Sequence, residues 1–152
     1  MAAASRPATR GFTLLELVIV LFLAGLVAAL VVPSFSGTLE SSRLRSGASD
    51  VRAALTLART LAVSGSSPRA AAFDIEGGRY AVEGEARRYV LPDGIRIESV
   101  RTGAEEATQG EVRVRFFPDG SAQDAEIVVV SQGGGRMRVT VEPLTGIAEA
   151  GT

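Results

Sequence analysis

The feature that most constrains this chain is a long apolar run close to its N-terminus. From Leu17 to Phe35 the residues are mainly Leu, Val, Ile, Ala and Phe, and no charge appears after Glu16 until Glu40. A helix that crosses a membrane needs about 20 apolar residues, each adding a rise of about 1.5 Å. The run has that length, and it therefore predicts a membrane-spanning helix.

The charges before the run predict its orientation. Arg6 and Arg10 lie in the short segment 1–11, which contains no acidic residue. Positive charge beside a membrane span stays on the cytoplasmic side. We therefore expect a cytoplasmic N-terminus and export of everything that follows the span.

This pattern is consistent with three kinds of N-terminal segment. A secretory signal peptide would be cut at small residues such as Val27-Ala28-Ala29, but this apolar run is too long and Glu16 lies inside its start. A plain signal anchor would stay uncut, and it gives Glu16 no role. The third kind is cut between Gly11 and Phe12, close before the span.

Glu16 favours the third kind of segment. A carboxylate at the edge of an apolar segment costs a few kcal/mol unless it is compensated. A place in the first helical turn, where the helix dipole favours an anion, offsets only ~1 kcal/mol. Cleavage between Gly11 and Phe12 would create an α-amino group four residues before Glu16, and this amine is a stronger form of compensation.

Composition removes much catalytic chemistry. The chain has no Cys, His or Trp, and all 16 basic residues are Arg, so that Lys is also missing. Cys and His nucleophile systems, Schiff-base lysines, Cys/His zinc sites, disulfides and P-loops are therefore excluded. Carboxylate pairs remain available to an enzyme. Without residues 1–11 the chain holds 14 Arg against 17 acids, a balance that disfavours nucleic-acid binding.

The N-terminal residues resemble a known signal. Arg10-Gly11-Phe12-Thr13-Leu14-Leu15-Glu16, followed by an unbroken apolar run, is similar to the class III signal of type IV pilins and type II secretion pseudopilins. The resemblance implies that a prepilin peptidase cuts after Gly11 and N-methylates the new N-terminal Phe12. It also implies that Glu16 is the carboxylate needed for subunit assembly.

The helix is expected to continue beyond the span as an amphipathic stalk. Pro33 interrupts the run and predicts a kink, at a place where the pilin family also carries a Pro. One apolar stripe then follows helical spacing, and Gly65 and Pro68 predict the end of the helix near Ser64. The stripe consists of Leu44, Ala48, Val51, Leu55, Ala58 and Ala62. A second row, formed by Arg45, Arg52 and Arg59, is either a solvated face or a subunit contact.

The remaining residues predict a β-rich head. Short apolar or alternating runs recur between turn signals such as Pro92-Asp93-Gly94 and Pro118-Asp119-Gly120. The predicted strands are Arg69–Ile75, Arg79–Val82, Arg88–Leu91, Gly94–Val100, Glu111–Phe117, Glu126–Val130 and Arg136–Glu142. Gly103 to Gly110 is expected to be an exposed loop. The expected fold class is α+β, with the long helix packed on one or two antiparallel sheets.

Three head motifs extend the resemblance over nearly the whole chain. They are Leu91-Pro92-Asp93-Gly94-Ile95, Val114-Arg115-Phe116-Phe117-Pro118-Asp119-Gly120-Ser121 and Val141-Glu142-Pro143-Leu144-Thr145-Gly146. In this order and spacing they resemble H-type minor pseudopilins of type II secretion and the allied FimT minor pilins. Major pseudopilins, which carry a calcium loop with a Trp, and major pilins, which close a loop with two Cys, are poorer matches.

The other charged groups give weak indications of chemistry. Asp119, Asp124 and Glu126 lie close in sequence but lack the spacing of a calcium loop, and we expect a solvated turn. The pair Glu105-Glu106 is expected to be a loop charge without a catalytic role. Arg136 and Arg138 share one face of a strand and are expected to form a solvated edge, with DNA contact as the alternative.

Together these observations predict four segments and one function. The segments are a cleaved leader (1–11), a transmembrane and assembly helix (12–35), an amphipathic stalk (36–66) and a periplasmic head (67–152), in a type IV pilin-like fold. The resemblance implies a minor pseudopilin at the pseudopilus tip, with a FimT-like minor pilin of a type IV pilus as the alternative. An anchored periplasmic enzyme is a third class, which the missing catalytic residues disfavour.

The same resemblance implies the surroundings of the protein. Its expected partners are other minor and major pseudopilins, the prepilin peptidase, the inner-membrane assembly platform and secreted proteins. No cofactor, metal or catalytic residue is expected. The expected location is the bacterial inner membrane in a single pass, with the head in the periplasm.

Overall fold

A computed structural model describes residues 12–151, apart from the side chains of residues 28–36. The elements are α1 (Leu14–Ser64), β1 (Arg69–Asp74), β2 (Arg79–Val82), β3 (Arg88–Val90), β4 (Ile95–Thr102), β5 (Glu105–Ala107), β6 (Glu111–Phe116), β7 (Ala125–Ser131), β8 (Arg136–Val141) and β9 (Ala148–Gly151). Two compact units divide the chain, residues 1–36 and residues 37–152. From here on we call the second unit the head, so that it includes the segment 37–66 that was predicted as the stalk.

The predicted helical stripe forms one wall of the core of the head. All six of its residues are buried, and Val51, Leu55 and Ala58 are fully so. The helix also lies close to β4, since a Cβ added to Gly47 would lie 2.9 Å from Cγ2 of Ile95. The predicted amphipathic face is therefore confirmed, and α1 is an integral part of the core.

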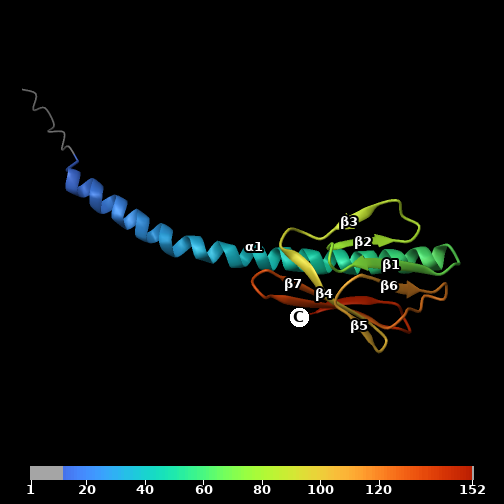
Figure 1. Cartoon of the computed structure of the whole chain (residues 1–152). Helices are drawn as coiled ribbons and strands as arrows, with labels where there is room; N and C mark the ends of the chain where they lie inside the picture. The colour runs from blue at the N-terminus through green and yellow to red at the C-terminus, as the bar shows by residue number, and fades with distance from the viewer. Residues whose placement is uncertain (1–11, 152) are drawn as a thin grey trace, which may run out of the picture. The chain divides into compact units, whose positions relative to one another are not determined.

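Two antiparallel sheets complete the head (Figure 1). The first has the strand order β3-β2-β1-β6, and the second has the order β5-β4-β7-β8-β9. Apolar residues alternate toward the inside, with Phe73 and Phe116 in the first sheet and Ile127 and Val139 in the second. Both sheets share a single hydrophobic cluster with α1, which confirms the predicted α+β class.

Two strands of the structure were not predicted from the sequence. The segment predicted as a loop, Gly103 to Gly110, contains β5, which pairs with the end of β4. The C-terminal residues form β9, which pairs with β8. Both strands lie at sheet edges, where backbone hydrogen bonds are sufficient and an apolar pattern is not required.

The helix ends where Gly65 and Pro68 predicted. The amide of Gly65 still donates to the carbonyl of Leu61 at 3.0 Å, and Ser67 donates to Ala62 at 3.2 Å. Ser66 has a positive φ of 46°, which turns the chain away from the helix axis and into β1. These bonds satisfy carbonyls that the last helical turn leaves without partners.

Candidate functional site

The candidate site is the N-terminal end of α1, where a threonine caps the helix. The amide of Glu16 donates to Oγ1 of Thr13 at 3.2 Å, and the amide of Leu17 donates to the carbonyl of Thr13 at 3.2 Å. Thr13 is therefore the N-cap residue, and α1 begins at Leu14. The cap was not among the features predicted from the sequence, although Thr-x-x-Glu before an apolar run is the pattern of a capping box.

The cap fixes the position of Glu16 in the first turn of α1. Backbone amides without helical partners point toward this end, and the helix dipole there favours an anion. Within the described part of the chain, residues 12–151, the structure gives the carboxylate of Glu16 no ion pair. The site therefore holds an acidic group at a fixed place, with the capacity to accept a cation from outside the subunit.

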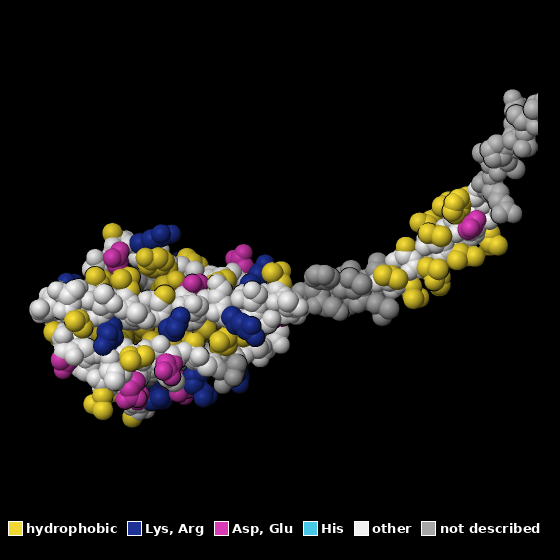
Figure 2. All heavy atoms as spheres, turned by 180° about the vertical axis from the view of Figure 1, so that it is seen from behind, with side chains coloured by type: hydrophobic (Ala, Val, Ile, Leu, Met, Phe, Trp, Pro, Cys, Tyr) yellow, Lys and Arg dark blue, Asp and Glu magenta, His cyan; other side chains and the backbone are white. Residues whose placement is uncertain are grey.

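The N-terminal portion of α1 is apolar on all of its sides. Its large apolar side chains from Leu14 to Val27 are each exposed by about half or more, and Phe12 is 77% exposed. Figure 2 shows hydrophobic side chains covering this part of the helix on the face in view. A helix that is apolar all round is suited to lipid or to a bundle of other helices.

Some predicted features of this region lie outside the described residues. Gly11, the residue expected before the cut, belongs to residues 1–11, and Pro33 belongs to residues 28–36, whose side chains are not described. The cleavage site and the kink remain predictions. Among the residues that are described, no helix is both long enough and apolar enough to cross a membrane.

The carboxylates near the second Pro-Asp-Gly turn bind separate groups of the head. Asp119 accepts hydrogen bonds from the amide of Ser121 at 3.0 Å and from its hydroxyl at 2.6 Å, and these bonds lower the pKa of Asp119. Asp124 pairs with Arg101 at 2.8 Å. Glu126 pairs with Arg101 at 3.5 Å and also with Arg138. The three carboxylates therefore stabilise a turn and a sheet surface.

Arg136 and Arg138 are exposed, as expected, but the expectation that they lie on an edge strand is wrong. Their strand, β8, lies between β7 and β9, because the chain returns to add a further strand. Arg136 pairs with Glu98 at 2.7 Å, and Arg138 pairs with Glu126 at 2.9 Å. Acidic partners on the same sheet reduce the positive charge that a DNA contact would need.

The arginine row on α1 divides into two kinds of residue. Arg45 and Arg52 are exposed, as a solvated or partner-binding face requires. Arg59 is half-buried, and its Nε donates to the carbonyls of Gly120 at 3.2 Å and Thr145 at 2.8 Å. Local sequence spacing does not predict this role of Arg59, since both acceptors are backbone atoms far along the chain.

Comparison with known proteins agrees with the fold and with the N-terminal sequence motif. The C-terminal part of α1 packed on two antiparallel sheets is a type IV pilin-like fold. Residues 6–32 match the prokaryotic N-terminal methylation motif. Residues 47–145 match the family of type II transport protein GspH. The chain belongs to this GspH family, and the resemblance inferred from its motifs is confirmed.

Individual relatives support the same assignment. A protein named type II secretion system protein H, from Xanthomonas campestris pv. campestris, is 28% identical over 150 residues, covering 93% of this chain and 83% of that protein. The minor pseudopilin EpsH of Vibrio cholerae shares the fold with a TM-score of 0.56 at 14% identity, covering 72% of this chain and 97% of that one. The type IV minor pilin FimU of Pseudomonas aeruginosa also has a TM-score of 0.56 at 14% identity, over 74% and 91%.

Proposed function

We propose that this protein is a minor pseudopilin of a type II secretion system, and that it acts as a structural and assembly subunit. The observation that carries the proposal is the presence of two matches in one chain. The N-terminal methylation motif covers residues 6–32, and the GspH head covers residues 47–145. The relative named type II secretion system protein H supports the same reading over most of the chain.

Processing would complete the N-terminal site. Cleavage after Gly11 would give Phe12 a free α-amino group, and N-methylation would leave this amine able to carry a positive charge. The cap at Thr13 holds Glu16 in the first turn of α1, four residues after the new terminus. Two opposite charges would then lie at one end of an apolar helix.

Pairing of these charges between subunits would drive assembly. The carboxylate of Glu16 on an incoming subunit would be costly in a layer of low dielectric constant, and the amine of Phe12 on a neighbour would offset that cost. Breaking a buried ion pair by removing one partner costs about 3–5 kcal/mol. Apolar side chains around the helix would then pack into the filament core.

The head would remain in the periplasm while the helix is held in the inner membrane. In this position the subunit would join other pseudopilins near the tip of the pseudopilus, after processing by the prepilin peptidase. The pseudopilus, extended by the inner-membrane assembly platform, would then move folded proteins toward the outer membrane. In this process the protein would act by binding other subunits, and the catalytic steps would be carried out by the peptidase and the assembly platform.

Mass spectrometry of the membrane-extracted protein tests the processing step. We expect Phe12 to be the N-terminal residue and to carry one added methyl group. A chain that still begins at Met1, or one that is cut near Ala29, would contradict the proposal. As a control, the Gly11→Val variant should remain uncut, because the peptidase acts after a glycine in this class of signal.

Deletion of the chromosomal gene separates secretion from pilus function. We expect loss of folded exoproteins from the medium, with normal twitching and DNA uptake, and recovery when the gene is restored. The alternative, a FimT-like minor pilin, predicts the reverse result. The fold alone does not distinguish the two, because EpsH and FimU match with the same TM-score of 0.56.

A further inference from the structure

Exposed apolar side chains gather at one end of the head. Six large apolar residues in the described part of the head are exposed, and four of them lie where α1 ends. We call these four the end patch: Val63, Phe117, Leu144 and Ile147. Figure 1 shows the end of α1 and the turns after β6 and β8 at this same end. Leu144 is 84% exposed. A partner that covered it would remove the free-energy cost of keeping this apolar side chain in water.

Contacts around Gly120 place the segments that carry these four residues side by side. Phe117 lies in the same turn as Gly120, whose amide donates to the carbonyl of Phe117 at 3.0 Å. A Cβ on Gly120 would lie 3.9 Å from Cγ2 of Val63. Leu144 and Ile147 lie in the same turn as Gly146, where a Cβ would collide with the carbonyl oxygen of Gly120.

Arg59 holds the two turns of the end patch in place. Its Nε donates to the carbonyls of Gly120 and Thr145, one from each turn. The amide of Ala122 also donates to the carbonyl of Pro143 at 2.8 Å, which joins the turns directly. The apolar side chains are therefore presented on a frame that is already ordered, and a partner would pay little ordering entropy on binding.

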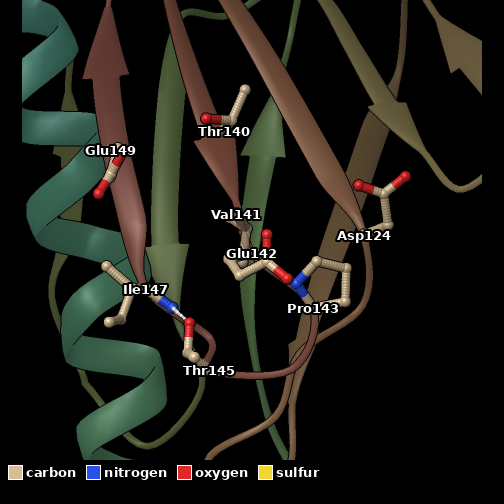
Figure 3. A pocket seen from close by; sticks show the side chains of 8 residues that line it. All are labelled: Asp124, Thr140, Val141, Glu142, Pro143, Thr145, Ile147 and Glu149. Carbon is tan, nitrogen blue, oxygen red and sulfur yellow. Dashed lines mark hydrogen bonds between the residues drawn. The ribbon is translucent and has the colours of Figure 1, made fainter.

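An acidic hollow adjoins the end patch (Figure 3). It is lined by Glu142 at the end of β8, by Glu149 on β9, by Asp124 and by Ile147 of the patch, with no basic residue among its lining side chains. Asp124 already pairs with Arg101. Glu142 and Glu149 have no ion pair with any residue that the structure describes. The hollow therefore places unneutralised carboxylates directly beside exposed apolar side chains.

We propose that this end of the head is the docking surface for a different pilin-like subunit, one that presents a basic side chain beside an apolar one. The apolar side chain would contact Phe117 and Leu144, and the basic side chain would enter the hollow near Glu142 and Glu149. Apolar contact supplies affinity, while the charge pair fixes orientation and partner choice. The identity of the partner as a pilin-like subunit rests on the proposed function.

A second copy of this chain is the less suitable occupant. The end of one head against the side of another is a heterologous contact, and such contacts propagate into open polymers of one subunit. In the proposed role of a minor subunit an open polymer of this chain would have no place, so its docking surface should instead fit a different chain. The chain has no Cys, which allows the choice to be tested with single introduced thiols.

The test uses the full chain in its own cells. Leu144→Cys carries a photoreactive thiol label at the end patch, and Val90→Cys carries the same label at an apolar position on β3 that is 67% exposed. We expect an adduct between Leu144→Cys and a different pilin-like subunit, identified by mass spectrometry, and no such adduct from Val90→Cys. An adduct with a second copy, with a secreted protein or with no protein would overturn the inference.

Charge reversal tests the acidic hollow. In the Leu144→Cys background, Glu142→Arg should lower the adduct yield about tenfold or more, because like charges face each other across the contact. Glu76→Arg reverses an exposed charge in the turn between β1 and β2 and should leave the yield unchanged. Equal yields from both variants would refute the role of the hollow.

Processing at Phe12 distinguishes the two proposals. If Phe12 is processed and secretion depends on the gene, but Leu144→Cys gives no adduct with another pilin-like subunit, the docking surface is wrong and the proposed function stands. If Phe12 is not processed, the proposed function fails. The docking inference then fails with it, because the inference names a pilin-like partner.

Discussion

Removal of the Arg59 guanidinium should destabilise the head, whereas removal of its neighbours in the same row should not. Arg59→Met keeps most of the apolar side-chain length and deletes the Nε–H group. This group is shared between the carbonyl oxygens of Thr145 at 2.8 Å and Gly120 at 3.2 Å. One substitution therefore detaches two turns from α1.

The size of the effect follows from the type of hydrogen bond. A hydrogen bond from a charged donor contributes about 1.5–3 kcal/mol to stability. Arg59 is half-buried and Thr145 is exposed, so water would replace part of the lost interaction. We expect the free energy of unfolding to fall by about 1–2 kcal/mol. At this chain length each kcal/mol corresponds to a fall of about 2–4 °C in Tm.

Urea unfolding of the full chain in detergent micelles, followed by circular dichroism, measures the change. The midpoint should move to lower urea concentration with the slope unchanged, since the exposed area on unfolding is the same. Arg52→Met is the matched control, seven residues earlier on the exposed face of α1, and it should change stability by less than about 0.5 kcal/mol. An equal loss from both variants, or no loss from Arg59→Met, would refute the reasoning.

Three further predictions concern other parts of the molecule. Glu16→Leu should still be processed but should assemble poorly, as measured by recovery of sheared or cross-linked filaments; equal recovery would contradict its pairing role. Gly146→Ala should cost at least about 2 kcal/mol, because its φ is 63° and the new Cβ would meet the carbonyl of Gly120. Gly103→Ala, at a φ of 59° in open space, should cost only about 1 kcal/mol, and urea unfolding compares the two. Glu40 accepts hydrogen bonds from Ser131 and from the amide of Gly133, which lower the pKa of its carboxyl group. The ionised carboxylate should therefore stabilise the head at pH values above 4.5, the ordinary pKa, and this stabilisation should be lost as the pH falls through the lowered pKa. Unfolding curves of Glu40→Gln and wild type should differ at pH 7 and converge in acid.

Much of the fold follows from local patterns in the sequence. The stripe from Leu44 to Ala62 repeats with helical spacing, and every one of its residues is buried. Alternation within β6 places Val114 and Phe116 inside and Arg115 outside. These patterns reflect a single buried face, which a periodic sequence specifies strongly. The helix and most strands could therefore be predicted without any structure.

The missed features depend on partners far away in the chain. The strand β5 is acidic, and β9 reads Ala-Glu-Ala-Gly, so neither has a β-type apolar pattern. Both form because an edge backbone was available to pair with. The two carbonyls that Arg59 contacts lie 61 and 86 residues further along the chain. A local spacing of residues cannot predict a hydrogen bond between an arginine and so distant a carbonyl. The Thr13 cap, in contrast, is local and could have been read directly from Thr-x-x-Glu.

The burial of the helical stripe has a consequence for how the head is oriented in an assembly. Shifting α1 by one residue against the sheets would turn it by about 100° and would carry Arg45 and Arg52 into the buried positions now filled by Leu44 and Val51. The cost of burying such a charge prevents the helix from sliding or rolling within the head. The head and this segment of α1 therefore turn as one body. Whatever sets the azimuth of residues 44–62 in a filament also decides which side of the head faces outward.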